Sequence, residues 1–400
     1  MSSALTIPNT LSPLPLDRPD SSQLLTHFLA RTANTMGNGS TDANPFIVQL
    51  IPLAFSHELI LDLVLTQSAV HRAVSELAKA DDTANEHYRG SLRLFRKHLS
   101  RFTGDSGNTM ILAAAALIMC FTETAKGDIN GAVFRHLVAA RHFLREILAR
   151  ESPSMTYDLK TFLVEYYIYS ATTSIISVEP RSDTQFLLSP EIESFAQHLT
   201  TIGYVGHLCG CWMDLLLLIP QIFELGRKAF PDNKSDQVAF PTADDMIVFS
   251  NLHARIVSYS PYGSVSSETA TTGYIYQQAM LLYLLTCLNG LEAQDPGKYR
   301  SMVAAAISEA ASHILQLPAT ARVNTSLCWP LAVIGACVAD SAIQDVLRTR
   351  LQFMLQTLGL GNVRQTARLL EHIWEMPLSQ RSPWTIYRTM QENQIWISFA

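Results

Sequence analysis

Apolar residues recur at intervals of three and four along most of the chain, which is the spacing of an α-helix that buries one face. The pattern is clearest in residues 57–80, 85–102, 107–127 and 128–148. No stretch gives a convincing alternation of apolar and polar residues, so strands are not expected. No period of 20 to 50 residues recurs either, which argues against a regular solenoid. The pattern therefore predicts an all-α fold, built as an irregular array of paired antiparallel helices.

One apolar run breaks at Lys126, Gly127 and Asp128 and then resumes with helical spacing. Glycine is favoured just past the end of a helix, and an aspartate carboxylate can accept hydrogen bonds from the free amide groups at a helix start. We therefore predict that Gly127 ends one helix and that Asp128 starts the next. The short connection would make the two helices a tight antiparallel pair.

Prolines mark the predicted boundaries of the helical domain. Four of them, at positions 8, 13, 15 and 19, keep the first residues out of a helix interior, so residues 1–20 are predicted to be a flexible leader and residues 21–400 the helical domain. Residues 230–241 are the best candidate for an internal linker. Pro220 lies inside apolar helical spacing that continues on both sides, which predicts a kinked helix.

Composition limits the kinds of partner. Hydrophobic residues make up 48% of the chain and charged residues 16%, as expected for a well-filled globular protein. The net charge is -6, and no basic run is longer than a pair such as Arg96 and Lys97. Nucleic-acid surfaces normally need clustered cations, so no direct contact with nucleic acid is expected. Apolar uncharged segments such as residues 279–291 fall short of the roughly 20 residues that span a bilayer, so no membrane partner is expected.

The cysteines and histidines do not form a recognisable metal motif. A binuclear zinc cluster needs closely spaced cysteine pairs with basic residues between them, whereas only Cys209 and Cys211 are near neighbours here. The closest histidines, His136 and His142, are six positions apart, which does not match zinc-protease spacing. We therefore expect buried, reduced thiols in an intracellular protein and no cofactor. The six cysteines are Cys120, Cys209, Cys211, Cys287, Cys328 and Cys337.

One acidic cluster offers a catalytic alternative. Asp81, Asp82, Asn85 and Glu86 could share a helical face, where they could hold a Mg²⁺ ion that grips a diphosphate, as in class I terpene cyclases. The simpler interpretation is that these acids favour a helix N-terminus, where negative charge is stabilised. No second carboxylate-rich helix is evident in the sequence, and no nucleophile elbow, phosphate-binding loop or dinucleotide fingerprint occurs.

Beyond these patterns, the chain resembles the fungal-specific transcription factor domain of the second type. Glu123, Gly127, Asp128, His136 and Leu137 match the E, GD and HL positions of that family, and Phe134 takes the place of its bulky aromatic residue. The resemblance implies that these residues mark a helix junction and its packing, without a catalytic role. The stretches that carry it are residues 44–73, 87–100, 111–144, 211–230 and 384–400.

The family's zinc cluster and basic linker usually precede this domain, whereas Met1 stands only about twenty residues before the first matching helix. We therefore expect a transcription regulator of a fungal, secondary-metabolite pathway that acts through other molecules without contacting DNA. Its partner would be a full-length zinc-cluster factor or an apolar small molecule, and its location the nucleus or the cytoplasm.

Two alternatives stay open. The helical scaffold could have been recruited as an enzyme of secondary metabolism on an apolar substrate, for example a terpene-cyclase-like lyase or isomerase that uses the acidic cluster. The chain could also be a truncated gene product whose missing first exon encodes the zinc cluster.

Overall fold

The computed structural model describes residues 20–75, 82–102, 104–128, 130–150, 155–178, 188–228, 241–288, 296–394 and 396–400. Within these ranges every regular element is a helix and no strand occurs, which confirms the all-α prediction. The predicted leader and linker lie outside the described residues, apart from Asp20 and Pro241 at their ends.

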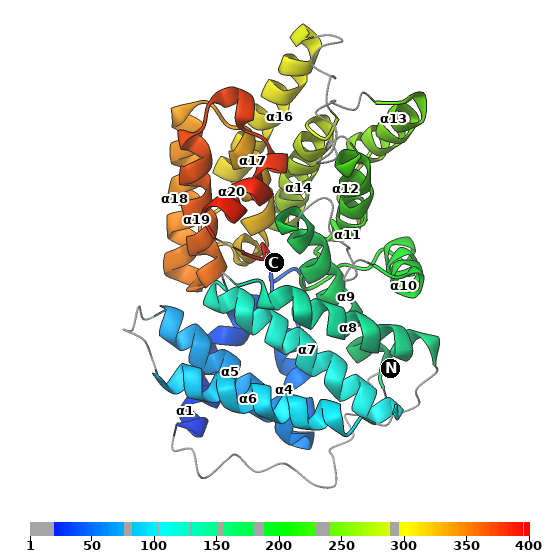
Figure 1. Ribbon diagram of the computed structural model, residues 1–400, viewed down its shortest axis with the longest axis vertical. Helices are drawn as coiled ribbons and strands as arrows, with labels where there is room; N and C mark the ends of the chain where they lie inside the picture. The colour runs from blue at the N-terminus through cyan, green and yellow to red at the C-terminus, as the bar shows by residue number, and fades with distance from the viewer. Residues whose placement is uncertain are drawn as a thin grey trace.

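The N-terminal helices form the lower part of the molecule in Figure 1. Their longest members, α5 to α8, pack side by side, and α7 and α8 run in opposite directions as the predicted pair. The elements are α1 (Ser21–His27), a π-helical turn (Phe28–Thr32), α2 (Ala33–Met36), α3 (Pro45–Val48), α4 (Leu50–Ser56), α5 (Glu58–Ser75), α6 (Asp82–Ser100), α7 (Ser106–Lys126) and α8 (Ala132–Ala149).

The C-terminal helices form the upper part, and α10 lies at its side. They are α10 (Pro190–Thr201), α11 (Met213–Leu216), α12 (Ile219–Arg227), α13 (Ala243–Val257), α14 (Ser267–Leu285), α16 (Pro296–Gln316), α17 (Cys328–Cys337), α18 (Ser341–Leu358), α19 (Gly361–Glu375) and α20 (Ile386–Glu392). Short 3-10 turns span Ile175–Ser177, Arg322–Ser326, Leu378–Gln380 and Pro383–Thr385.

Helix α9 (Tyr157–Ser174) and the C-terminal residues join the two parts (Figure 1). Every residue of α9 from 161 to 174 is buried. The Ser174 hydroxyl lies 2.8 Å from the Ser398 hydroxyl, and the Ser177 hydroxyl donates to the Ile397 carbonyl at 2.5 Å. The Asn362 amide of α19 donates to the Ala400 carbonyl at 2.7 Å. The end of the chain is therefore fixed in the centre of the molecule.

Buried Glu165 of α9 holds the segment that leads from α10 into α11. Its carboxylate accepts hydrogen bonds from the Leu208 and Cys209 amides at 2.7 and 2.8 Å, and from the Tyr204 hydroxyl at 2.8 Å. A buried carboxylate requires such donors, because an unpaired one would be strongly destabilising. This contact anchors the segment before α11 to α9.

Helix α7 is long and apolar enough to cross a membrane by length and composition, judged over the described residues. However, 89% of that stretch is buried inside the protein, and the core helix of a globular protein passes the same test.

The six cysteines are free thiols, and five of them are buried.

Two details of the helix predictions are wrong. Pro220 does not kink a continuous helix: α11 ends at Leu216, and Pro220 stands in the first turn of α12, where its missing amide hydrogen costs nothing. The helix after Gly127 begins at Ala132, four residues later than predicted, because Gly131 adopts a left-handed conformation immediately before it.

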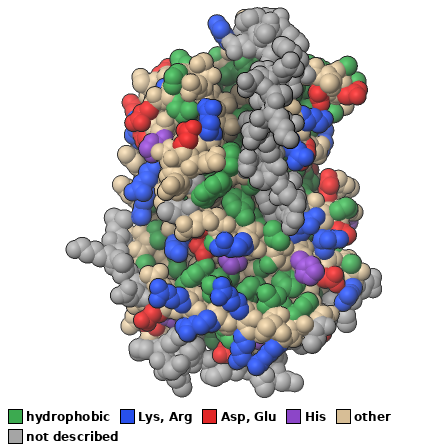
Figure 2. Space-filling model, in the orientation of Figure 1, with side chains coloured by type: hydrophobic (Ala, Val, Ile, Leu, Met, Phe, Trp, Pro, Cys, Tyr) green, Lys and Arg blue, Asp and Glu red, His purple; other side chains and the backbone are tan. Residues whose placement is uncertain are grey.

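The surface charge is divided unevenly. Residues 82–150 contain ten Lys and Arg against six Asp and Glu, while the rest of the chain contains 19 against 29. Figure 2 shows Lys and Arg side chains spread over the lower half of the molecule, where Figure 1 places α6, α7 and α8. A net negative protein therefore carries a positive region on its N-terminal helices.

Candidate functional site

The end of α7 is closed by a pair of hydrogen bonds that define a Schellman motif. The Asp128 amide donates to the Glu123 carbonyl at 2.9 Å, and the Gly127 amide donates to the Thr124 carbonyl at 3.0 Å. Gly127 has φ of +75°, a left-handed conformation that favours glycine. The prediction that Gly127 ends a helix is confirmed.

Asp128 then links the two helices, although it is not the first residue of α8. Its carboxylate accepts from the Asn130 amide at 2.9 Å and from the Ala132 amide at 2.5 Å. The carboxylate thus satisfies a free amide at the start of α8, as the sequence suggested, from four residues upstream.

At the same junction, the backbone at the end of α7 lies against the backbone at the start of α19. A Cβ atom added at Gly127 would come within 2.9 Å of the Gly361 carbonyl group, and one added at Gly361 would come within 2.4 Å of the Lys126 carbonyl oxygen. No real side chain tolerates such distances without movement. Two glycines therefore allow the end of α7 to meet the start of α19.

Glu123 is a buried carboxyl beside this contact. It accepts a hydrogen bond from the Tyr88 hydroxyl of α6, and its other oxygen lies 3.9 Å from the Lys126 ammonium, which sits over the Tyr88 ring at 5.1 Å. Burial raises the pKa of Glu123, while the Tyr88 hydrogen bond opposes that rise. This group ties α6 to the end of α7.

The remaining signature residues belong to the core of α8. Leu137 is completely buried and His136 is 8% exposed. Burial lowers the pKa of His136 to about 4, helped by neighbouring Arg135, so its imidazole is neutral at physiological pH. Phe134, three residues after Gly131, packs against the core from a partly buried position. These positions have packing roles.

The acidic cluster is described only in part. Asp81 lies outside the described residues, and Asp82 begins α6, but its side chain is not described. Asn85 and Glu86 are exposed on the first turns of α6. In the described part of the chain, no group of three or more His, Cys, Asp or Glu residues is placed to hold a metal ion. The Mg²⁺ site stays a prediction.

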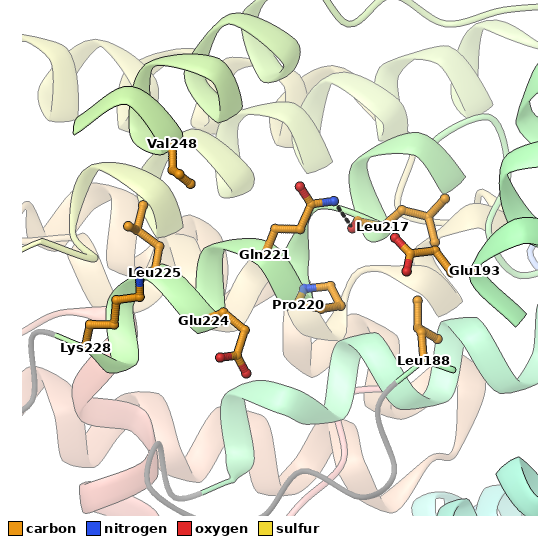
Figure 3. A pocket seen from close by; sticks show the side chains of 9 residues that line it. All are labelled: Leu188, Glu193, Leu217, Pro220, Gln221, Glu224, Leu225, Lys228 and Val248. Atoms are coloured by element: carbon orange, nitrogen blue, oxygen red, sulfur yellow. Dashed lines mark hydrogen bonds between the residues drawn. The ribbon is translucent and has the colours of Figure 1, made fainter. Parts of the chain in front are cut away.

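A pocket of about 370 Å³ lies between α10, α12 and α13, far in sequence from the acidic cluster. Its size falls within the usual range for small-molecule sites. Figure 3 shows the side chains that line it. The apolar ones are Leu188, Leu217, Pro220, Leu225 and Val248, and the polar ones are Glu193, Gln221, Glu224 and Lys228. We call this the α12 pocket.

Most polar groups of the α12 pocket already have partners. The Glu224 carboxylate pairs with Arg227 at 3.0 Å, and the Lys228 ammonium pairs with Asp245 at 3.0 Å. The Gln221 amide donates to the Leu217 carbonyl at 3.2 Å, the bond drawn in Figure 3, and its oxygen accepts from Arg255 at 3.2 Å.

Glu193 is different. Its half-buried carboxylate has no hydrogen bond or ion pair to any described residue, and in Figure 3 it extends over the part of the pocket lined by Leu217, Pro220 and Leu188. Judged over the described residues, the pocket thus offers apolar side chains and an acceptor, the Glu193 carboxylate, that no protein group uses.

Sequence reasoning missed this pocket. Its lining comes from α10, α12, α13 and residues next to them. The three helices are separated by residues 202–218 and 228–242, and no local pattern shows which of their faces meet. Pro220 was the one local signal, because a proline is favoured in the first turn of a helix; it stands in the first turn of α12 and lines the pocket.

A family model described as the fungal specific transcription factor domain matches residues 23–400, nearly the whole chain. The chain belongs to this family. Among curated proteins it is similar to Sterol uptake control protein 2 of Candida albicans, with 30% identity over 98 residues. That match covers 24% of this chain and 14% of the relative, so the chain corresponds to a small part of it. No solved structure matches the chain.

Membership of the fungal transcription factor domain family confirms the resemblance seen in the sequence and supports a role in transcription regulation. In this fungal transcription factor domain, the residues that match the family pattern lie at one helix junction and in the core of α8. They hold the scaffold together, whereas the α12 pocket and the basic region of Figure 2 are two features of the described residues that are open to other molecules.

Proposed function

We propose that this fungal transcription factor domain regulates transcription by binding a protein or an apolar small molecule, without direct contact to DNA. The small molecule binds in the α12 pocket. The observation that supports this site is its combination of five apolar side chains with the unpartnered Glu193 carboxylate. Such a site suits a largely apolar ligand that offers one N–H or O–H donor, since a half-buried acceptor without a partner among the described residues favours a donor.

The regulated genes are those of a fungal pathway, and secondary metabolism is the pathway class that we propose. Deletion of the gene is then expected to change the transcript levels of such a pathway. Unchanged transcripts together with the loss of a single metabolite would instead indicate an enzyme, and the regulatory proposal would fail. A fluorescent tag on the full chain is expected to report protein in the nucleus.

The pocket can be tested with a neutral apolar dye, Nile red, whose emission rises and shifts to the blue in apolar sites. Val248 lines the α12 pocket and is 41% exposed, so Val248→Trp should fill part of the pocket without opening the core. Ile247 is the neighbouring residue of α13, is 60% exposed and does not line the pocket, so Ile247→Trp is the matched control.

We expect the wild-type protein and Ile247→Trp to enhance the dye equally, and Val248→Trp to lose most of the enhancement. A neutral, amine-bearing analogue of the dye should in addition bind more weakly to Glu193→Gln. Equal enhancement by both tryptophan variants would show that the dye binds elsewhere, and the pocket would lose its support.

A further inference from the structure

A stripe of exposed cations runs along α6. Arg89, Arg93, Arg96, Lys97 and Arg101 are all exposed, and the first three are spaced by four and three residues, so they share one helical face. From the first to the last, the stripe extends roughly 18 Å along the helix and the residue that follows it. We call these five residues the α6 basic stripe.

Within the described part of the chain, no carboxylate pairs with the α6 basic stripe. None of its five side chains forms an ion pair with a described residue, and among them only the Arg93 guanidinium hydrogen-bonds to a described residue, donating to the Arg89 carbonyl of its own helix at 3.3 Å. Two other cations of this region are engaged: Arg145 pairs with Glu191 at 3.4 Å and Arg150 with Glu146 at 3.0 Å.

The acids of the same region do not neutralise the stripe. Glu123 and Asp128 are buried and used at the α7 junction, and Asp105 caps the start of α7. Glu86 is exposed one turn before Arg89, and it forms no ion pair with a described residue. A partner that comes within the screening length of roughly 10 Å therefore meets the positive charge of the stripe.

Apolar side chains lie beside the cations. Leu92 and Leu99 are seven positions apart on one flank of the stripe, and Leu99 is 43% exposed. Figure 2 shows hydrophobic side chains between the Lys and Arg side chains over this part of the surface. A partner that contacts the stripe thus meets both positive charge and apolar area.

We propose that the α6 basic stripe docks an acidic, amphipathic segment of a partner protein. Charge complementarity supplies attraction and orientation, and apolar side chains of the segment cover Leu92 and Leu99. A phosphate backbone would use the cations alone and would leave Leu99 in water. The inference does not depend on the α12 pocket, which lies on α10, α12 and α13.

The test uses the full chain and a fluorescent 16-residue peptide. In this peptide, pairs of acidic residues (Glu or Asp) alternate with pairs of apolar residues (Leu or Phe). Three other probes distinguish the sources of negative charge: the same peptide with Ser in place of Leu and Phe, a short DNA duplex, and vesicles rich in phosphatidylserine. Binding is followed by anisotropy or co-sedimentation at two salt concentrations.

Three variants separate the contributions. Arg93→Glu combined with Arg96→Glu reverses the centre of the stripe, and Leu99→Ser removes its apolar flank. Arg368→Glu is a single charge reversal away from the stripe, at an exposed arginine of α19 without an ion pair to a described residue. Because all the changed side chains are exposed, each variant should melt close to the wild type.

We expect the amphipathic peptide to bind best, to weaken about tenfold or more with the double reversal and several-fold with Leu99→Ser, and to be unchanged by Arg368→Glu. Its binding should fall as salt rises. Equal loss with Arg368→Glu would contradict the proposal, because the attraction would then not reside on α6. Tighter binding of DNA or vesicles, with no effect of Leu99→Ser, would overturn it in favour of a phosphate site.

Discussion

The backbone contact between the end of α7 and the start of α19 gives the sharpest prediction. Gly127→Ala places a Cβ in the left-handed region and within 2.9 Å of Gly361. The left-handed backbone costs roughly 1–2 kcal/mol and the overpacking typically 1–3 kcal/mol more, so we expect a total loss of about 2–5 kcal/mol. Gly361→Ala carries the clash alone and should cost about 1–3 kcal/mol.

Gly203→Ala is the control, because Gly203 has φ of +68° and no atom within 4 Å of its added Cβ. It should lose only the backbone part, roughly 1–2 kcal/mol. For a chain of this length, unfolding entropy is about 0.8 kcal/mol per degree, so Gly127→Ala should lower Tm by about 2–6 °C. Thermal unfolding by circular dichroism measures all three. If Gly127→Ala costs no more than Gly203→Ala, the two backbones do not meet as described.

Three further predictions concern buried groups and the alternative chemistry. Burial lowers the pKa of His71 to about 4, from 6.5 when unfolded. The stability contributed by the neutral ring is therefore full above pH 6.5 and is lost as pH falls toward 4, and the loss at pH 5 is about 2 kcal/mol. His71→Gln should flatten the pH dependence of the urea midpoint between pH 7 and 5. Tyr88→Phe leaves buried Glu123 without the Tyr88 hydroxyl donor, so the free energy of unfolding measured by urea titration should fall by about 1–3 kcal/mol. The control Tyr157→Phe changes an exposed tyrosine and should alter it by no more than about 0.5 kcal/mol. Equal effects of the two changes would contradict the buried contact. Purified protein with Mg²⁺ and prenyl diphosphates should release no hydrocarbon, and a product that disappears in Asp82→Ala would reverse this expectation.

The surroundings of His71 explain why its proton matters. Its Nε2 lies 2.9 Å from the Leu358 carbonyl at the end of α18, and its Nδ1 lies 3.0 Å from the Thr32 hydroxyl and 3.2 Å from His27. Arg31 also faces it and disfavours a second positive charge. Protonation would remove the one acceptor that the ring offers to Thr32 and His27.

Local rules predicted much of the fold. The three-and-four spacing gave the long helices from α5 to α8, and Gly127 and Asp128 marked the right junction, because helix caps depend on residues close in sequence. The partner of that junction could not be predicted in the same way. Gly361 lies more than 230 residues away, and nothing local shows which glycine the backbone must approach.

The candidate binding surfaces were harder still. The α12 pocket depends on how three helices pack, and the sequence does not encode that packing in any short pattern. The α6 basic stripe was visible in principle. A search for consecutive basic residues finds nothing longer than a pair, such as Arg96 and Lys97, whereas helical spacing brings Arg89, Arg93 and Arg96 onto one face.

The most direct measurement is of transcripts in a strain that lacks the gene and carries the wild-type chain, Val248→Trp or Ile247→Trp. Regulation through the α12 pocket predicts that the deletion changes the transcripts of a pathway, that the wild type and Ile247→Trp restore them, and that Val248→Trp at equal protein level does not. Equal restoration by all three chains, or a deletion that leaves every transcript unchanged, would contradict it.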